Sequence, residues 1–515
     1  MRKIILLIIL SFVNIFPLNA QDGTIDPTFN QIGIGFSGTV YCITLQNDGK
    51  IFVGGKFDLF NGLKCPSGII RLNKDGTLDN TFNPEGKGFS NDSFDTVVYC
   101  INVQNDGKIL VGGNFHYYND SLCSYGLIRL NNDGKIDHSF NDKGYGFDNG
   151  NYMTDILTIL IQNDEKLLIG GSFNRYNDKD CPSGLIRLDR DGKIDTTFNY
   201  NGKGFYCCAK TLDLQIDGKI IAGGAYFTYN CTWVPSCLIR INIDGSLDTT
   251  FNYNGGGFFD STMWVTNCVV ILNDGKILVG GRFSKYDTTD CSTSLVKINS
   301  DGTIDSTFNY NGVGFSKYFS MYYDSEVYKL ALQKDSKIIV CGSFSKYNDS
   351  LCSQSLIRLN PDGSYDNSFN FAGAGINDTK GIAYTVCIQD DWKILVGGTF
   401  GNYNNLQCLG NLIRLNNSEL TNIDDELTFK TSNITISPNP AINEIGINFT
   451  IEEKCFAQIF IYSQLGELVA NISDTGIGDG SHSVNFNTSH LPPGVYFCQI
   501  KAGSYIETKK FVMVK

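Results

Sequence analysis

The sequence predicts an all-β protein: a seven-bladed β-propeller closed by its own N-terminal strand, followed by a small C-terminal β-sandwich. Three observations lead to this prediction. Three short phrases each recur seven times, the phrases are out of phase at the two ends of the repeat region, and the composition changes near residue 433. The 515 residues include 55 Gly and 11 Pro, and 42% are hydrophobic, which is typical of a turn-rich globular β protein.

The repeats are visible as three phrases, and self-similarity of this kind fixes the architecture of a chain. The phrase Asp-Gly-x-[Ile/Leu/Tyr]-Asp-x-[Thr/Ser]-Phe-Asn begins at Asp22, Asp75, Asp133, Asp191, Asp244, Asp301 and Asp362. A Gly-Gly pair followed by x-Phe begins at Gly54, Gly112, Gly170, Gly280 and Gly397, with variants at Gly223 and Cys341. Leu-Ile-Arg-Leu-Asn or a near copy surrounds Arg71, Arg129, Arg187, Arg240, Lys297, Arg358 and Arg414.

Each repeat contains the pattern of four short strands. In the first complete repeat, runs at 40–46 and 50–57 flank Asn-Asp-Gly, and runs at 68–73 and 77–82 flank Asp-Gly. Gly supplies the positive φ that a tight β-turn requires, so both junctions are predicted to be hairpins. Four strands repeated seven times predict a propeller, with a β-solenoid or an array of small domains as the alternatives.

The ends of the repeat region favour a closed ring. An isolated Asp22–Asn30 phrase stands at the N-terminus, whereas Leu412–Asn416 lacks the phrase that should follow it. An N-terminal strand that completes the last blade would remove both exposed edges. Counting four residues to either side of each turn Asp predicts the cross-strand ion pairs Arg71–Asp79, Arg129–Asp137, Arg187–Asp195, Arg240–Asp248, Lys297–Asp305 and Arg358–Asp366. By the same register we expect Asp26 beside Arg414 and Ile25 beside Leu415.

The N-terminus has the pattern of a signal peptide. Arg2 and Lys3 precede an apolar run from Ile4 to Pro17, and the small Ala20 offers a cleavage point. We expect a signal peptide over 1–20, a propeller over 21–417, a linker over 418–432 and a secretion or sorting β-sandwich over 433–515. After removal of the signal we expect no transmembrane segment. The net charge of −12 disfavours nucleic acid as a partner.

Four motifs follow one another in the C-terminal module: Ser437–Pro440, Ile461–Val469, Leu491–Tyr496 and Lys509–Lys515. With these motifs the module resembles the C-terminal sorting domain of the type IX secretion system of Bacteroidetes. The matching residues include Pro438, Asn439, Pro440, Gly466, Gly494, Tyr496, Lys510 and Lys515. The resemblance implies recognition by the type IX secretion machinery and a secreted or outer-cell-surface location.

The Asp-Gly…Phe-Asn phrase and the Asp-Gly-Lys-[Ile/Leu]-x-[Val/Ile]-Gly-Gly-x-Phe phrase recur over residues 22–416. In this the repeats resemble the delta-60 repeat, a propeller-forming unit of bacterial surface proteins. The resemblance implies a fold and carries no settled activity that could be transferred.

One aromatic residue recurs five positions after the second Gly of each pair and precedes Asn or Asp. These residues are Phe60, Tyr118, Tyr176, Tyr229, Tyr286, Tyr347 and Tyr403. We expect them on the rim opposite the Asp-Gly turns, where a ligand would bind. An aromatic face beside amide groups suits a sugar ring. The alternative, in which the rings fill gaps between blades, is preferred because repeated positions are usually architectural.

The cysteines suggest disulfides, because an exported protein meets oxidising conditions. The total of 17 is odd, and five pairs have nearly one spacing: Cys42/Cys65, Cys100/Cys123, Cys208/Cys231, Cys268/Cys291 and Cys387/Cys408. Cys455 and Cys498 are a separate candidate pair in the tail. Each pair could form a disulfide within its blade. Alternatively, the cysteines are free and act as small buried hydrophobic residues, because an intervening strand would hold the two thiols of a pair too far apart to bond.

Enzymatic signatures are missing from the sequence. The chain has four His, no Gly-x-Ser-x-Gly elbow, no phosphate loop and no His-Glu-x-x-His. The Asp-rich turns fit turn chemistry better than a calcium loop. We expect no cofactor, no metal, and a non-enzymatic binding or adhesion module for a glycan or a surface protein. The alternatives are a secreted polysaccharide-acting hydrolase or lyase with its site on the loop face, and a purely structural spacer.

Overall fold

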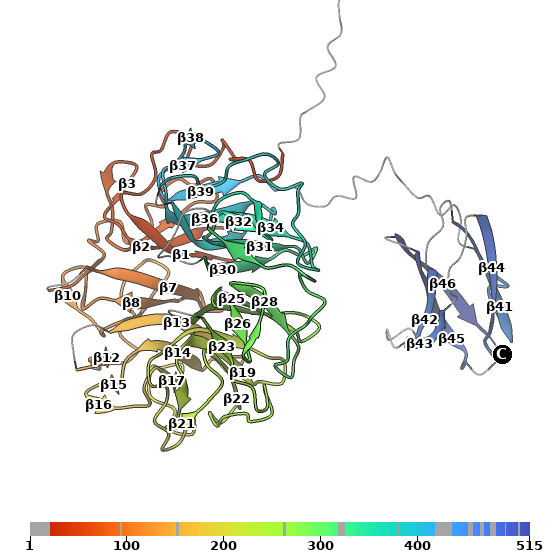
Figure 1. Cartoon of the computed structure of the whole chain (residues 1–515), viewed down its shortest axis with the longest axis horizontal. Coiled ribbons are helices and arrows are strands. Elements are labelled where there is room, and N and C mark those ends of the chain that lie inside the picture. The colour runs from red at the N-terminus through yellow and green to blue at the C-terminus, as the bar shows by residue number, and fades with distance from the viewer. Residues whose placement is uncertain are drawn as a thin grey trace, which may run out of the picture. The chain divides into compact units, whose positions relative to one another are not determined.

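A computed structural model describes residues 21–92, 95–150, 154–260, 264–317, 325–379, 381–417, 435–451, 457–463, 468–473, 480–489, 491–502 and 505–514. These residues form strands and turns, and none of them lies in a helix. The chain divides into two compact units, Met1–Glu419 and Leu420–Lys515 (Figure 1). The predicted signal peptide (1–20) and linker (418–432) lie outside the described residues. Within the described ranges, no helix is long and apolar enough to cross a membrane.

The first unit is a ring of blades, and its described residues form seven three-stranded blade sheets, numbered here in chain order. Each sheet joins an inner, a middle and an outer strand: β1(Thr39–Leu45), β2(Ile51–Lys56) and β5(Ile69–Leu72); β7(Val97–Val103), β8(Ile109–Asn114) and β11(Leu127–Leu130); β13(Asp155–Ile161), β14(Leu167–Ser172) and β17(Leu185–Leu188); β18(Cys208–Leu214), β19(Ile220–Ala225) and β22(Leu238–Ile241); β24(Val265–Ile271), β25(Ile277–Arg282) and β28(Leu295–Ile298); β30(Glu326–Leu332), β31(Ile338–Ser343) and β34(Leu356–Leu359); β35(Ile382–Ile388), β36(Ile394–Thr399) and β39(Leu412–Leu415). The inner strands pack in the order β1, β7, β13, β18, β24, β30, β35 and back to β1, so the ring is closed.

A short hairpin connects the middle and outer strands of each blade. The hairpins are β3(Leu59–Phe60) with β4(Leu63–Lys64), β9(Tyr117–Tyr118) with β10(Ser121–Leu122), β15(Arg175–Tyr176) with β16(Lys179–Asp180), β20(Thr228–Tyr229) with β21(Thr232–Trp233), β26(Lys285–Tyr286) with β27(Thr289–Asp290), β32(Lys346–Tyr347) with β33(Ser350–Leu351), and β37(Asn402–Tyr403) with β38(Leu406–Gln407). The segment that arrives from the preceding blade pairs with this hairpin at β6(Phe89–Ser90), β12(Phe147–Asp148), β23(Phe258–Phe259) and β29(Phe315–Ser316). Consecutive blades are therefore joined by backbone pairing.

The ring closes through the N-terminal segment. Ile25 forms an antiparallel bridge with Leu415, and the Asp26 backbone N–H donates to the Arg414 carbonyl at 2.8 Å. The Asn416 N–H donates to the Thr24 carbonyl at 2.7 Å. This is the arrangement that the register of the repeats predicts. The N-terminal segment thus supplies the fourth strand of blade 7, as Leu78 does for blade 1 by bridging Leu72.

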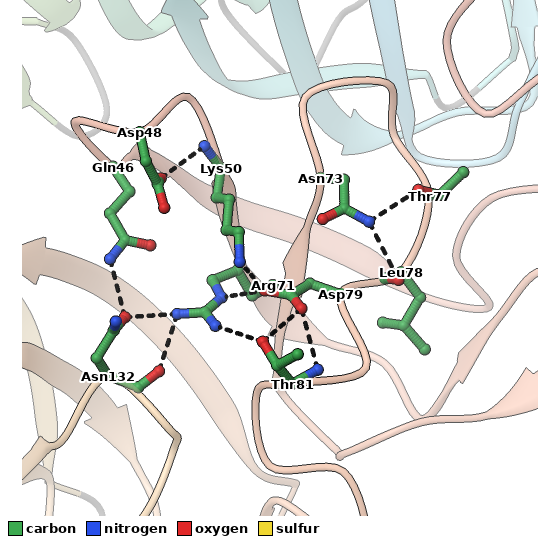
Figure 2. A network of polar contacts seen from close by, with 10 residues as sticks. All are labelled: Gln46, Asp48, Lys50, Arg71, Asn73, Thr77, Leu78, Asp79, Thr81 and Asn132. Atoms are coloured by element: carbon green, nitrogen blue, oxygen red, sulfur yellow. Dashed lines mark hydrogen bonds and ion pairs between the residues drawn. The ribbon is translucent and has the colours of Figure 1, made fainter.

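A buried charge cluster fixes the end of each blade, and Figure 2 shows the cluster of blade 1. In blade 1, Arg71 Nε lies 2.6 Å and Lys50 Nζ lies 2.8 Å from Asp79 Oδ2. Arg71 Nη1 also donates to the backbone and side-chain oxygens of Asn132, at 2.9 and 2.6 Å, in the Asp-Gly turn of blade 2. One arginine therefore holds its own blade together and binds the next one.

The cluster recurs around the ring. The predicted Arg–Asp and Lys–Asp pairs lie at 2.6–3.5 Å, and Arg414 Nε lies 2.8 Å from Asp26 Oδ2. Lys108, Lys166, Lys219, Lys276, Lys337 and Lys393 repeat the role of Lys50. The contact to the next turn also recurs, ending with Arg414 on the Lys74 carbonyl of blade 1. Arg358 instead binds Asp22 and Asn417, because both ends of the propeller chain build the turn of blade 7.

The second unit contains two antiparallel sheets, as predicted for a β-sandwich. One sheet orders β40(Thr435–Ser437), β41(Glu444–Ile451) and β44(Gly480–Asn487), and the other orders β43(Leu468–Ser473), β42(Ala457–Ser463), β45(Gly494–Ala502) and β46(Tyr505–Met513). Alternate residues of both sheets form one buried cluster that includes Ile445, Ile447, Ile459, Ile461, Cys498 and Phe511. This alternation is what packs the two sheets face to face.

We predict that Asp26→Ala destabilises the propeller by about 3 kcal/mol, because it leaves the buried Arg414 guanidinium without its carboxylate. Urea unfolding of the mature chain measures the change. Asp142→Ala is the control, since Asp142 is exposed and its loss should cost less than about 0.5 kcal/mol. Equal unfolding midpoints for the two variants would contradict closure through Asp26.

We also predict acid sensitivity. Burial by itself raises the pKa of Asp26, but hydrogen bonds from Lys393 and Thr28 outweigh it and lower the pKa to about 2. In the other blades, hydrogen bonds from the equivalent Lys and from the equivalent Thr or Ser likewise outweigh burial and lower the pKa of Asp79, Asp137, Asp195, Asp248, Asp305 and Asp366. A lowered pKa stabilises the folded state above the unfolded pKa of about 3.9, and this stabilisation is lost as the pH falls toward the folded value.

The free energy of unfolding should therefore decrease as the pH is lowered from about 4 toward 2. Urea titrations at a series of pH values measure it, with added salt held constant. A free energy of unfolding that stays level across that interval would show that these carboxylates do not stabilise the fold.

Candidate functional site

The aromatic residues predicted as ligand contacts belong to the core, and that prediction is wrong. Phe60, Tyr118, Tyr176, Tyr229, Tyr286, Tyr347 and Tyr403 are only 1–4% exposed. The six tyrosine hydroxyls donate at 2.5–2.7 Å to the carbonyls of Gly134, Gly192, Gly245, Gly302, Gly363 and Gly23 in the Asp-Gly turns. The hairpin brings its ring to the turn instead of to the opposite rim, so the architectural alternative is correct.

The amides beside these rings are also occupied. Asn177 Nδ2 donates to Asn141 Oδ1 at 2.6 Å, and Asn177 Oδ1 accepts from the Gly146 N–H at 2.8 Å. Asn141 lies on the segment that arrives from the preceding blade. Sequence reasoning proposed that these Asn side chains bind a sugar. In the structure they instead connect neighbouring blades through hydrogen bonds.

The predicted blade disulfides are also wrong for this structure: Cys42/Cys65, Cys100/Cys123, Cys208/Cys231, Cys268/Cys291 and Cys387/Cys408 are all free thiols. The first cysteine of a pair lies on the inner strand and the second precedes the outer strand, with the middle strand between them. Strands are spaced about 4.8 Å apart, so the two backbones are about 10 Å apart, beyond the reach of a disulfide. Cys455 lies outside the described residues, and Cys498 is a buried free thiol.

The sorting motifs meet at one edge of the second unit. Asn439 Oδ1 accepts from the Val512 N–H at 2.9 Å, and Asn439 Nδ2 donates to the Lys510 carbonyl at 3.3 Å. Pro438 and Pro440 flank Asn439, so the first motif is tied to the last strand. Gly494 begins β45, and the Tyr496 hydroxyl donates to the Pro492 carbonyl at 3.0 Å. Gly466 and Lys515 lie outside the described residues.

The inside of the ring is lined by one bulged residue from each inner strand. The pairing register shifts at Tyr41, Tyr99, Leu157, Lys210, Asn267, Tyr328 and Tyr384. The four tyrosine rings form a row in which neighbouring centroids lie 4.9–5.5 Å apart, in the order Tyr99, Tyr41, Tyr384 and Tyr328. Lys210 donates to Asn267, and Asn267 donates to Glu326 at 2.7 Å. Because the tyrosine rings contact one another and Lys210 and Asn267 have hydrogen-bond partners, the axis is a weaker candidate site than the outer edge.

Blade 4 departs from the repeat at three exposed positions. Tyr206, Phe227 and Trp233, the blade-4 aromatic stack, are 76%, 36% and 76% exposed. The ring centroids of Tyr206 and Phe227 lie 5.5 Å apart, and those of Phe227 and Trp233 lie 5.2 Å apart with nearly parallel planes. Other blades carry Lys64, Leu122, Asp180, Asp290, Leu351 and Gln407 at the position of Trp233. Trp233, which completes the stack, is therefore specific to blade 4.

A groove of about 380 Å³ borders Trp233, between the outer hairpin of blade 4 and the segment that leads to blade 5. Tyr253, 76% exposed, lines the groove together with the exposed polar residues Thr232, Thr249 and Asn254. Arg240 and Asp248 also border it but are paired with each other at 2.7 Å. The blade-4 groove thus offers aromatic rings, hydroxyls and an amide, whereas the charged groups at its border are held in an ion-pair cluster.

Equivalent grooves exist in blades 2 and 7, with volumes of about 270 and 530 Å³. Leu122 takes the place of Trp233 in blade 2, and Gln407 takes it in blade 7. The position of Tyr253 is occupied by Asp142 and Gln31, respectively. Sequence reasoning missed the blade-4 groove because it followed the recurring residues, whereas the signal lay in the departures at 206, 227 and 233.

Comparisons with known families match both units. Residues 435–515 match the family described as secretion system C-terminal sorting domain. Six segments, 46–82, 104–140, 162–198, 215–251, 272–308 and 333–369, match the family described as domain of unknown function (DUF5122) beta-propeller. A search of curated proteins gave no match.

Two solved structures are similar over most of the chain. One is PorZ, described as an essential bacterial surface component of the type IX secretion system of Porphyromonas gingivalis, at 11% identity and a TM-score of 0.40. The alignment covers 94% of this chain and 60% of that one. The other is a fungal alcohol oxidase of the AA5 family in complex with copper, at 13% identity and a TM-score of 0.39, covering 94% of this chain and 98% of that one. The chain thus carries DUF5122 β-propeller repeats and a secretion system C-terminal sorting domain, which indicates export by type IX secretion to the cell surface or the medium.

Proposed function

We propose that this exported protein is a non-enzymatic binding module that holds a neutral glycan in the blade-4 groove. The observation that carries the proposal is the exposed aromatic stack of Tyr206, Phe227 and Trp233 beside a groove that also contains Tyr253. Sugar rings present apolar C–H faces and a rim of hydroxyls. An aromatic face next to hydroxyl and amide groups complements both.

Preorganisation supports this proposal. Phe227 is in the middle of the stack and is the least exposed of the three rings. It packs against both outer rings, so Trp233 and Tyr206 lose little side-chain freedom when a ligand binds. A rigid aromatic side chain gives a higher affinity than a mobile one, because less conformational entropy is lost when the ligand binds.

The charge of the chain favours a neutral ligand. The net charge of −12 opposes the approach of an anionic polysaccharide or a strongly acidic protein. The charged residues that border the groove are already engaged, since the Asp248 carboxylate binds both Arg240 and Lys219. A neutral polysaccharide or oligosaccharide therefore fits the groove better than a charged polymer.

We predict that Trp233→Leu weakens glycan binding about tenfold, or ~1.4 kcal/mol, because Leu cannot stack on a sugar ring. Leu is the residue that blade 2 carries at this position, so the variant should fold normally. The mature chain is screened against neutral polysaccharides by pull-down, and affinity for a soluble oligosaccharide is measured by calorimetry. Tyr253→Asp, which copies Asp142 of blade 2, should act in the same direction.

Leu122→Ala is the matched control, because it changes the equivalent groove of blade 2 and should leave the affinity unchanged. Release of soluble products from the polysaccharide would instead support the hydrolase or lyase. Binding that persists in Trp233→Leu would remove the blade-4 groove from consideration, and capture of a surface protein without any glycan binding would identify the ligand class as protein.

A further inference from the structure

Two adjacent cysteines lie next to the blade-4 aromatic stack. Cys207 and Cys208 follow Tyr206 directly, and they are the one pair of neighbouring cysteines in the sequence. Their sulfur atoms lie 3.7 Å apart, linked by a thiol–thiol hydrogen bond. Cys207 is exposed, whereas Cys208 begins β18 and is buried. A solvent-accessible thiol thus has a second, protected thiol within contact distance.

The position of this pair in the fold is specific to blade 4. The connection from Phe205 to the inner strand is as short as that of blade 1, where Gly38 and Thr39 occupy the two positions. Cys231, which the sequence spacing paired with Cys208, lies at the tip of the hairpin β20–β21. The nearby Cys237 is buried, and its thiol is directed to the Trp264 carbonyl. Cys208 is therefore the thiol that is positioned to form a disulfide with Cys207.

We propose that Cys207 and Cys208 form a redox-active dithiol that closes reversibly to a disulfide between neighbouring residues. Closure moves the sulfur atoms from 3.7 Å to about 2.0 Å. The resulting disulfide is strained, because the Cα atoms of adjacent residues are about 3.8 Å apart, whereas the Cα atoms of a relaxed disulfide are more than about 4.4 Å apart. A strained disulfide is easily reduced, so this pair exchanges and does not act as a permanent crosslink.

The chemistry is thiol–disulfide exchange with a low-molecular-weight disulfide. The Cys207 thiolate attacks one sulfur of the oxidant, which forms a mixed disulfide and releases one thiolate. The Cys208 sulfur then gives up its proton and attacks Cys207 Sγ, which releases the second thiol. Two protein thiols are oxidised and one disulfide is reduced to two thiols, so electrons and protons balance.

The electrostatics agree with Cys207 as the attacking group. The hydrogen bond shared with Cys208, supported by the positive charge of Lys210, lowers the pKa of Cys207. The same hydrogen bond together with burial raises the pKa of Cys208, which keeps its proton until the second step. Export also exposes the pair to an oxidising environment, in which disulfides persist.

The test uses the mature chain, reduced and then treated with oxidised glutathione. Alkylation, digestion and mass spectrometry should find the peptide that contains Cys207 and Cys208 lighter by two hydrogens and without alkyl groups, and dithiothreitol should reverse this. Cys208→Ser should stop at the mixed disulfide and retain glutathione on Cys207. Cys207→Ser should leave Cys208 reduced.

Cys231→Ser is the control, because it removes another exposed thiol and should leave the oxidation of the dithiol unchanged. Circular dichroism and urea unfolding confirm that each variant folds. The proposal is overturned if Cys207 and Cys208 are both alkylated after oxidation of the wild type. It is equally overturned if the wild type accumulates the same stable glutathione adduct as Cys208→Ser, since Cys208 would then have no part in the exchange.

Discussion

The carboxylate at the start of each fourth strand is the interaction on which the propeller depends. Asp79 binds Lys50, which directly precedes the middle strand, and Arg71 of the outer strand, so one buried group fixes three segments of a blade. The same arginine reaches the turn of the next blade at Asn132. Because the cluster joins blades as well as strands, a ring of blades follows from repeating one local arrangement. In blade 7 the carboxylate is Asp26, which comes from the other end of the propeller chain.

Burying these charges costs desolvation energy, which only complete pairing offsets. Arg414 shows how complete the pairing is: its guanidinium binds Asp26, the Thr28 hydroxyl and the Lys74 carbonyl, and it lies 4.7 Å from the centroid of the Phe29 ring. With so many fixed partners, the charged groups of the cluster have few hydrogen-bonding positions left for a ligand. The recurrence of a residue in every blade therefore indicates architecture, and individual function must be sought where a blade departs from the pattern.

The sequence predicted the fold well, because the strand phrases and their register are local signals. The pairing of Asp26 with Arg414 followed from counting residues around each turn. The candidate site was harder to predict. Tyr176 was assigned to the wrong rim because its hairpin folds back to the Asp-Gly turn. The groove of blade 4 brings together the hairpin at Trp233 and the segment at Tyr253. The same two positions meet in blades 2 and 7, but Trp233 departs from the repeat and was therefore not singled out by the recurring residues.

Exposure of the stack is itself an argument for a binding role. Single exposed aromatic residues are ordinary on protein surfaces, but contiguous ones mark interaction sites. Trp233 contributes little to folding while 76% of it is exposed, and blade 2 forms the same hairpin with Leu122. The fold therefore does not require Trp233, Phe227 or Tyr206 to be aromatic. In a chain that a sorting domain directs to the cell surface or the medium, these rings meet the molecules outside the cell. The rigid ring is thus the scaffold for the proposed binding surface, which lies on one altered blade.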